Sequence, residues 1–176
     1  MVDSAELRSY IERIVGDMDK NQLAGMEKAP LEYAVKIKEK IDSLLTQHYK
    51  ETFTHWLETE RIVCRPFYKL PAYIHPTTHT NIYGGSLYQA EEGNMDKLEL
   101  ALVREFTALT NIKWWHRNIS KQGFCINGFI NHYPDFIVMT QNGKIILVEP
   151  KGEHLKNDES RKRIELGRAR KNAAGS

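Results

Sequence analysis

Residues 133–155, which read YPDFIVMTQNGKIILVEPKGEHL, constrain the fold more than any other part of this chain. Two short apolar runs, residues 136–139 and 145–148, flank the dipeptide Asn142-Gly143. That dipeptide between two apolar runs is a strong signal for a tight β-hairpin turn. A hairpin brings its own two ends together, and in this segment the two ends carry charged side chains.

Two carboxylates and one ammonium group meet where the hairpin closes. Asp135 precedes the first strand, whereas Glu149 and Lys151 follow the second. Like charges repel in a low dielectric, so such a cluster is costly unless an ion or a substrate uses it. Mg²⁺ is typically held by one or two carboxylates together with substrate phosphate. The sequence therefore predicts a divalent-cation site at this end of the hairpin.

The register of the hairpin decides whether the two carboxylates share a face. A two-residue loop over Asn142-Gly143 would pair Phe136 with Glu149. Because side chains alternate along a strand, that register leaves Asp135 on the opposite face. A three-residue loop ending in a left-handed Gly143 pairs Asp135 with Glu149 directly. We expect this second register, or an equivalent bulge, because the chemistry needs both carboxylates together.

The same residues resemble the PD-(D/E)xK nuclease superfamily. Pro134-Asp135 matches the first half of its motif and Glu149-Pro150-Lys151 the second. Two more stretches, WWHRN at residues 114–118 and the run KGEHL, NDES and LG within residues 151–167, extend the likeness. From about residue 86 to 169 the chain resembles the C-terminal endonuclease domain of the Res subunit of Type III restriction enzymes. The resemblance implies an α/β fold with a mixed central sheet flanked by helices, preceded here by an N-terminal helical extension.

The resemblance also implies an activity, which is Mg²⁺-dependent hydrolysis of phosphodiester bonds in double-stranded DNA, with Mn²⁺ able to substitute. The implied catalytic residues are Asp135, Glu149, Lys151 and a glutamate from the preceding helix. The three carboxylates would be the metal ligands. Counting back from WWHRN selects Glu99 as the helix glutamate, with Glu105 as its rival. Periodicity leaves both open, because each adjoins one of the apolar positions Leu98, Leu102, Phe106 and Leu109.

DNA contacts are expected mainly from the basic segment that follows Lys151, where Lys and Arg outnumber Asp and Glu. Such a helix would follow the phosphate backbone, which carries no sequence information. The expected contact residues are Arg117, His154, Lys156, Arg161 and Lys162. An alternative interpretation is that Arg117 forms ion pairs with the site carboxylates.

Bulk properties set limits on the remaining functions. The formal net charge is only +2, so composition alone does not indicate a nucleic-acid binder. No ATP-binding motif is present, and the two cysteines lack metal-type spacing. No apolar run approaches the length of a membrane span, and we expect a cytoplasmic protein. If the chain is a fragment, its partners are the helicase part of Res and the methyltransferase (Mod) subunit, which selects the target.

The chain divides into three expected parts. Residues 1–85 form a helical region with connecting strands, in which Asp3 caps one helix and Pro30 begins another. Residues 86–172 form the nuclease core, with strands at 112–117 and 123–130, the hairpin, and a basic helix from Ser160. Residues 173–176 are an added tail. The alternatives are a non-catalytic DNA- or protein-docking domain on the same fold, and another PD-(D/E)xK nuclease, such as a repair enzyme or a junction resolvase.

Overall fold

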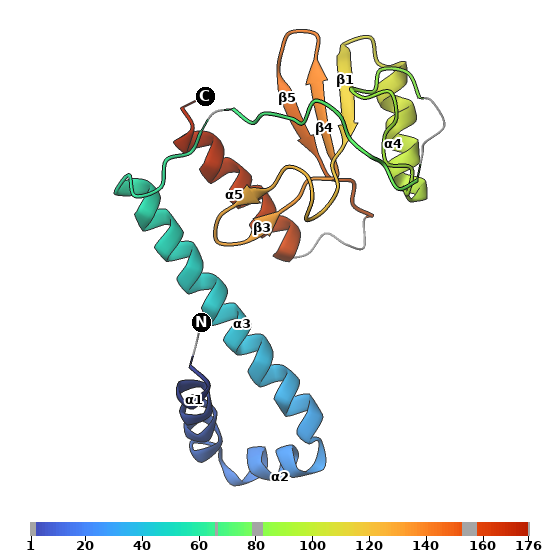
Figure 1. The fold of residues 1–176 in the computed structure, drawn as a ribbon. Coiled ribbons are helices and arrows are strands. Elements are labelled where there is room, and N and C mark those ends of the chain that lie inside the picture. The colour runs from blue at the N-terminus through green and yellow to red at the C-terminus, as the bar shows by residue number, and fades with distance from the viewer. Residues whose placement is uncertain (1–2, 66, 79–82, 153–157, 176) are drawn as a thin grey trace. The chain divides into compact units, whose positions relative to one another are not determined.

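The structure is a computed structural model that describes residues 3–65, 67–78, 83–152 and 158–175. The chain divides into two compact units, Met1–Thr52 and Phe53–Ser176 (Figure 1). The first unit is helical, and the second contains every described strand. The residues predicted to carry chemistry all belong to the second unit.

The helical unit contains α1 (Ser4–Gly16), α2 (Lys20–Lys28) and most of α3 (Pro30–Glu58). Asp3 caps α1 as expected, because its carboxylate accepts the N–H of Ala5 at 3.3 Å. Asp19 caps α2 in a capping box, and Pro30 occupies the first position of α3. None of the described residues up to Thr52 is buried.

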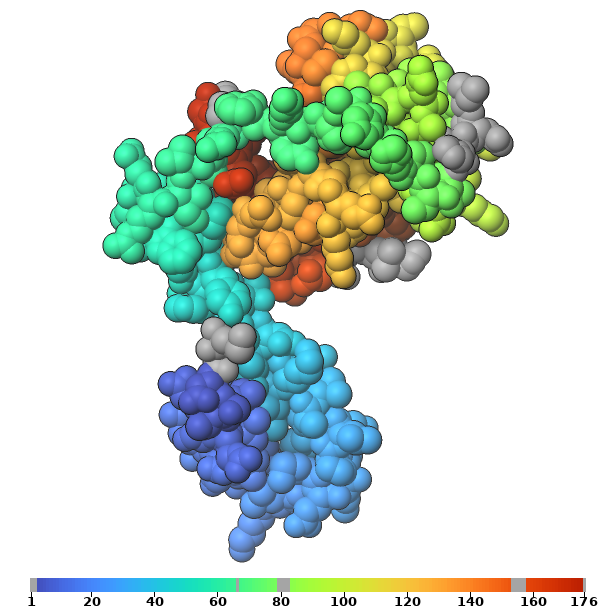
Figure 2. Space-filling model, in the orientation of Figure 1, coloured from blue at the N-terminus to red at the C-terminus, as the bar shows by residue number. Residues whose placement is uncertain are grey.

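The second unit is built on a three-stranded antiparallel sheet. Its strands are β1 (Ile112–Arg117), β4 (Phe136–Thr140) and β5 (Ile145–Val148), in the order β1-β4-β5. Helix α4 (Lys97–Ala108) precedes β1 and packs on one face of the sheet (Figure 1). Strand β5 lies at the edge, with Ile145–Val148 largely exposed on the orange surface in Figure 2.

The hairpin between β4 and β5 has the three-residue loop that the sequence analysis favoured. Phe136 pairs with Val148, and the pairing continues to Thr140, whose N–H donates to the carbonyl of Lys144 at 2.9 Å. Residues 141–143 form the loop, and Gly143 has a φ of +80°. This backbone conformation favours glycine, because a side chain there would be strained. The predicted register is confirmed.

The core beneath the sheet joins α4 to β1 and β4. Val103 and Phe106 of α4 pack against Trp115, Phe136 and Val138. The apolar face predicted for this helix was partly wrong, because Leu98 and Leu109 are 42% and 48% exposed. The buried positions are instead Glu99, Val103 and Phe106, which recur at helical spacing. Glu99 thus belongs to the buried face of its helix.

A second core cluster forms around α5 (Asp158–Ala173). Leu166 of α5 packs with Phe53, Ile126 and Phe129. Residues 123–130, which include Ile126 and Phe129, were predicted to form one strand. Only the short strand β2 (Ile126–Asn127) forms there, and it pairs with β3 (Asn131–His132). The reason lies in Phe124, whose N–H and carbonyl bond to the side chain of Asn118 rather than to a neighbouring strand.

The expectation of an α/β fold is confirmed in this coarse form. Every paired strand described is antiparallel, and the one described parallel contact is the bridge between Ser86 and Trp115. It is reinforced by bonds from the Leu87 N–H to the Trp115 carbonyl at 2.8 Å and from the Trp115 N–H to the Gly85 carbonyl at 2.9 Å. Within the described residues, helices with the length and apolar character needed to cross a membrane are not found.

Candidate functional site

The antiparallel ladder of the hairpin ends where two prolines face each other. The Thr140 N–H donates to the Lys144 carbonyl, so this position and every second pair from it have the spacing of hydrogen-bonded pairs. Continuing the register places Pro134 opposite Pro150 at the next such position after Phe136 and Val148. Neither proline has an N–H to donate, so the ladder stops there. This accounts for Pro150, which is awkward inside a strand but acceptable at this end.

Continued by one position beyond Phe136 and Val148, the same register places Asp135 opposite Glu149. By the same alternation this is a non-hydrogen-bonded pair, the kind in which facing side chains approach most closely. The backbone of Asp135 is anchored on its other side, where its carbonyl accepts the N–H of Asn118 at 2.9 Å. Both carboxylates are therefore directed to the same end of the sheet.

The environment of Asp135 disfavours its charged form. Burial raises the pKa of this carboxyl, and the charges of Glu149 and Glu99 raise it further. Arg117 and Lys151 act in the opposite direction but do not cancel the shift. Arg117 Nη1 lies 3.8 Å from Asp135 Oδ1. Asp135 is thus a carboxylate that a bound cation would stabilise.

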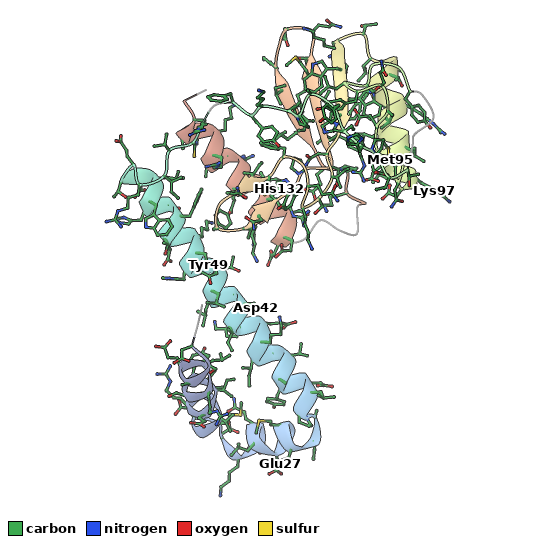
Figure 3. All side chains as sticks on the ribbon, in the orientation of Figure 1. Glu27, Asp42, Tyr49, Met95, Lys97 and His132 are labelled. Carbon is green, nitrogen blue, oxygen red and sulfur yellow. The ribbon has the colours of Figure 1, made fainter. Side chains whose placement is uncertain are left out.

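Glu149 is surrounded by positive groups instead. Lys151 Nζ lies 2.7 Å from its Oε1, and Arg163 of α5 also donates to Oε1. His132 Nε2 lies 3.5 Å from its Oε2. Burial lowers the pKa of His132, and the neighbouring charges of Arg163 and Lys151 add to this despite the opposing effect of Glu149. Figure 3 labels His132 in the short β2–β3 hairpin, which contacts α5 through β2.

Glu99, rather than Glu105, faces this site. Its Oε1 lies 2.9 Å from Arg117 Nη2, and its Oε2 accepts the N–H of Asp96 at the start of α4 at 2.9 Å. Glu105 is exposed. The choice of Glu99 by counting back from residues 114–118 agrees with this geometry. Both of its oxygens are already bonded, however, and its link to Asp135 runs through Arg117.

The WWHRN stretch supplies the support behind the carboxylates. Trp115 is a core residue, and His116 is buried with its Nδ1 2.8 Å from Glu91 Oε2. The same oxygen of Glu91 accepts the N–H of Arg117 at 3.1 Å. Glu91 is almost fully buried and was missed by sequence reasoning, since no motif or spacing marks it. It fixes the backbone from which the Arg117 side chain reaches Glu99.

Asn118 holds the loop before Asp135 in place. Its Nδ2 donates to the carbonyls of Phe124 and Pro134 at 2.9 and 2.8 Å, and its Oδ1 accepts the Phe124 N–H at 2.6 Å. Gly123 makes room for it, because a Cβ there would lie 2.1 Å from Asn118 Oδ1. The buried Asn118 side chain therefore fixes the backbone of the segment that carries Asp135.

The predicted DNA contacts fall into three groups. Arg117 is largely buried and forms ion pairs with Glu99 and Asp135, which agrees with the alternative interpretation of this residue. Arg161 and Lys162 lie on α5, where they pair with Asp158 at 2.8 Å and Glu159 at 3.1 Å. His154 and Lys156 lie outside the described residues.

Arg163 was not predicted, although it lies three positions before the buried Leu166 and so shares the inward side of α5.

The donor set fits a divalent cation in part. Asp135 and Glu149 offer carboxylate oxygens within one electrostatic cluster. Burial and the charge of Glu149 both raise the pKa of Asp135, and a bound cation would oppose both effects. Glu99 is separated from the two proposed ligands, because Arg117 bridges it to Asp135. Consistent with this, the described part of the chain holds no group of three or more His, Cys, Asp or Glu arranged around a metal position.

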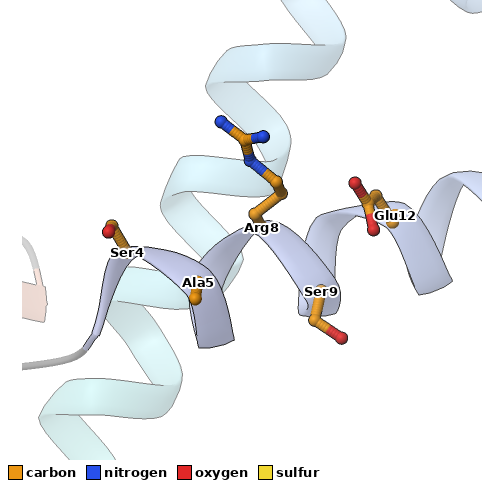
Figure 4. Close-up of a pocket in the computed structure, with 5 residues that line it drawn as sticks. All are labelled: Ser4, Ala5, Arg8, Ser9 and Glu12. Atoms are coloured by element: carbon orange, nitrogen blue, oxygen red, sulfur yellow. The ribbon is translucent and has the colours of Figure 1, made fainter.

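The two hollows described on this chain both belong to the helical unit, and one of them is lined by Leu7, Tyr10 and Leu44 together with Glu6, Ile41 and Leu45. The other is a surface depression lined by Ser4, Ala5, Arg8, Ser9 and Glu12 (Figure 4). All five residues lie on α1, so the depression is the surface of a single helix rather than an enclosed cavity.

Comparison with known proteins adds no assignment, since no family model, curated protein or solved structure matches this chain.

Proposed function

We propose that residues 86–172 form a Mg²⁺-dependent DNA endonuclease domain with a PD-(D/E)xK core, resembling the nuclease part of a Type III Res subunit. The observation that carries this proposal is the register of β4 and β5, which aligns Asp135 with Glu149 just beyond the paired strands, with Lys151 bonded to Glu149. Carboxylates forced together in a half-buried position are unfavourable by themselves. A site for a dication and a phosphate explains why they are there.

Each residue has a distinct part in the proposed hydrolysis. Asp135 and Glu149 hold the metal, and Lys151 donates to an oxygen of the scissile phosphate or orients the attacking water. When bound, the dication neutralises charge on the phosphate and lowers the pKa of that water. Glu99 acts through Arg117, which it holds against Asp135. Glu99 is therefore a positioning residue in this proposal.

Substrate binding would rest on phosphate contacts rather than on base contacts. Arg161 and Lys162 on α5, together with His154 and Lys156 before it, would follow the DNA backbone without reading its sequence. In the family that the chain resembles, target selection belongs to the methyltransferase subunit and DNA delivery to the helicase. The domain alone is thus expected to be sequence-blind and weakly binding, in keeping with its net charge of +2.

The test is plasmid cleavage with Mg²⁺ or Mn²⁺ at low ionic strength. The parent chain should nick supercoiled DNA slowly and without site preference, and the rate should fade as salt is raised. Asp135→Asn should abolish nicking but keep or strengthen DNA binding, since it removes a ligand and a charge that repels phosphate. Lys151→Ala should also abolish nicking. Retained cleavage in Asp135→Asn would rule out the metal role.

Glu99→Gln and Glu105→Gln form a matched pair on one helix. Only the first alters a residue bonded to Arg117, so only the first should reduce the nicking rate. Equal rates in the two variants would remove Glu99 from the proposal. Fast cutting at one defined site by the isolated chain would instead indicate a self-sufficient nuclease.

A second candidate, a non-catalytic DNA- or protein-docking domain, is favoured by one observation. Glu149 already has Lys151 and Arg163 as partners, so its charge is balanced without a metal. Thermal unfolding with and without Mn²⁺ separates the two functions, because a ligand that binds only the folded state raises the melting temperature. A docking domain should show no such rise.

A further inference from the structure

Glu149 has more cationic neighbours than Asp135. Lys151 and Arg163 both contact its Oε1, whereas the side chain of Asp135 has one described ion-pair partner, Arg117, at 3.8 Å. The two carboxylates nevertheless belong to one electrostatic cluster, since the charge of Glu149 contributes to the raised pKa of Asp135. The positive groups are thus concentrated at one of two carboxylates that the proposed function uses together.

The formal charges of the cluster cancel. Three carboxylates and three permanent cations face one another, so the sum is 3 − 3 = 0; they are Glu99, Asp135, Glu149, Arg117, Lys151 and Arg163. A dication placed between Asp135 and Glu149 changes this sum to +2. The loaded cluster then repels its own cations and attracts an anion, which the unloaded cluster does not.

Of the three cations, Arg163 is the one to which neither a buried position nor a part in the hydrolysis is assigned. Arg117 is 14% exposed and is held by Glu99 and by its position over the Phe136 ring. Lys151 lies only two residues from Glu149 on the same segment of chain. Arg163 has the same side-chain exposure as Lys151, 32%, but it reaches Glu149 from a separate helix. Its guanidinium can turn from a carboxylate to a phosphate, which has matching bidentate geometry.

We propose that Arg163 is a displaceable counter-cation of Glu149, which a dication releases so that its guanidinium binds a phosphate of the DNA backbone. This inference rests on the proposed function and adds a coupling to it. Metal binding and phosphate binding become linked through one residue of α5. Arg163 is accordingly a phosphate-binding and positioning residue, and no bond to the reacting water is assigned to it.

Calorimetric titration with Mn²⁺ tests the first half of the proposal. The variant is Arg163→Met, which removes the charge but keeps a long apolar side chain over the same surface. Arg168→Met is the matched control, because Arg168 is an exposed residue of the same helix. Without the competing guanidinium, Arg163→Met should bind Mn²⁺ about twofold more tightly than the parent, the equivalent of about 0.5 kcal/mol for an exposed ion pair. Arg168→Met should bind as the parent does, and Arg163→Lys should return the affinity toward the parent value.

Binding of a short DNA duplex with and without Ca²⁺, a hard dication that also takes oxygen ligands, tests the second half. Ca²⁺ should strengthen duplex binding by the parent and by Arg168→Met. Arg163→Met should lose most of this gain although it binds the cation better. A merely structural role for Arg163 would lower both affinities together, so the opposite signs are diagnostic.

The failures can be told apart. If the parent binds Mn²⁺ and Arg163→Met binds it equally or less well, the displacement is wrong while the proposed function stands. If Arg163→Met binds Mn²⁺ more tightly but keeps the full Ca²⁺-dependent gain in duplex binding, the phosphate contact is wrong. If neither protein binds Mn²⁺, the proposed function fails and this inference fails with it. Thermal unfolding of each variant verifies that it is folded under the conditions of the titration.

Discussion

Two flanks of the carboxylate cluster are held in different ways. The inner flank, which comprises Glu91, Glu99, Arg117 and Asn118, is tied by ion pairs and by hydrogen bonds to buried backbone. The outer flank, which comprises Glu149, Lys151 and Arg163, is tied by side-chain ion pairs alone among its described contacts. The side chains of the Arg117–Glu99 pair are 14% and 11% exposed, against 32% and 15% for Arg163–Glu149.

The difference indicates which flank is scaffold and which can change partners. A desolvated pair is costly to break, because the remaining charge is left without water or a counter-ion. A more exposed pair contributes less, since water and salt can replace either partner. The inner flank should therefore fix geometry, while the outer flank can exchange ions. Substitutions on the inner flank should therefore lower the free energy of unfolding more than substitutions on the outer flank.

The largest loss of folding stability is expected from Arg117→Met. It leaves Glu99 buried without its counter-ion and removes the cation that lowers the pKa of Asp135. Breaking a buried pair in this way should lower the free energy of unfolding by about 3 kcal/mol, as measured by chemical denaturation. Arg104→Met, at an exposed position of α4, is the control and should change it by less than about 0.5 kcal/mol. Equal losses would erase the distinction between buried and exposed arginines.

The second loss is expected from Asn118→Ala. The substitution removes the partners of the Phe124 N–H and of the carbonyls of Phe124 and Pro134. Unsatisfied buried polar groups cost about 1–3 kcal/mol each, and partial hydration brings the expected total to about 2 kcal/mol. Asn127→Ala, at an exposed asparagine of β2, should be nearly neutral. A neutral Asn118→Ala would mean that the loop before Asp135 is held by other contacts.

A smaller loss of about 1–2 kcal/mol is expected from Gly123→Ala, because the added methyl would overlap the amide oxygen of Asn118. The comparison variant is Gly167→Ala in α5, where a Cβ meets nothing within 4 Å. That substitution should be neutral or should stabilise the helix by up to about 1 kcal/mol. Thermal unfolding of both variants gives the sign directly. The same sign in both would contradict the close approach at residue 123.

The sequence was most informative where local chemistry decides the structure. The Asn142-Gly143 turn, with its left-handed glycine, determined the loop length and hence the pairing of Asp135 with Glu149. Pro30 and Asp3 marked helix starts for equally local reasons. In each case a few adjacent residues carry the whole physical argument. The coarse α/β class followed from the order of such elements.

The missed features depend on contacts between distant segments. Glu91 approaches His116 from 25 positions away, and Arg163 reaches Glu149 across the connection to α5. Periodicity also misplaced the apolar face of α4, because a glutamate paired with arginine occupies a buried position there. The strand expected at residues 123–130 was shortened by the side chain of Asn118, which supplies bonds that a neighbouring strand would otherwise make. Tertiary partners decide all of these.

The smallest effect is expected on the outer flank, from Arg163→Met. Glu149 keeps Lys151 at 2.7 Å, so loss of the guanidinium leaves its charge compensated. We expect the free energy of unfolding to fall by about 0.5 kcal/mol at low salt. Because this pair is the more exposed one, raising the salt concentration should remove most of that difference, while the loss in Arg117→Met should persist. Denaturation of both variants at low and high salt compares the flanks directly. A large, salt-insensitive loss of stability in Arg163→Met would show that the outer flank also fixes geometry. An arginine bound so firmly to Glu149 could not move to a phosphate.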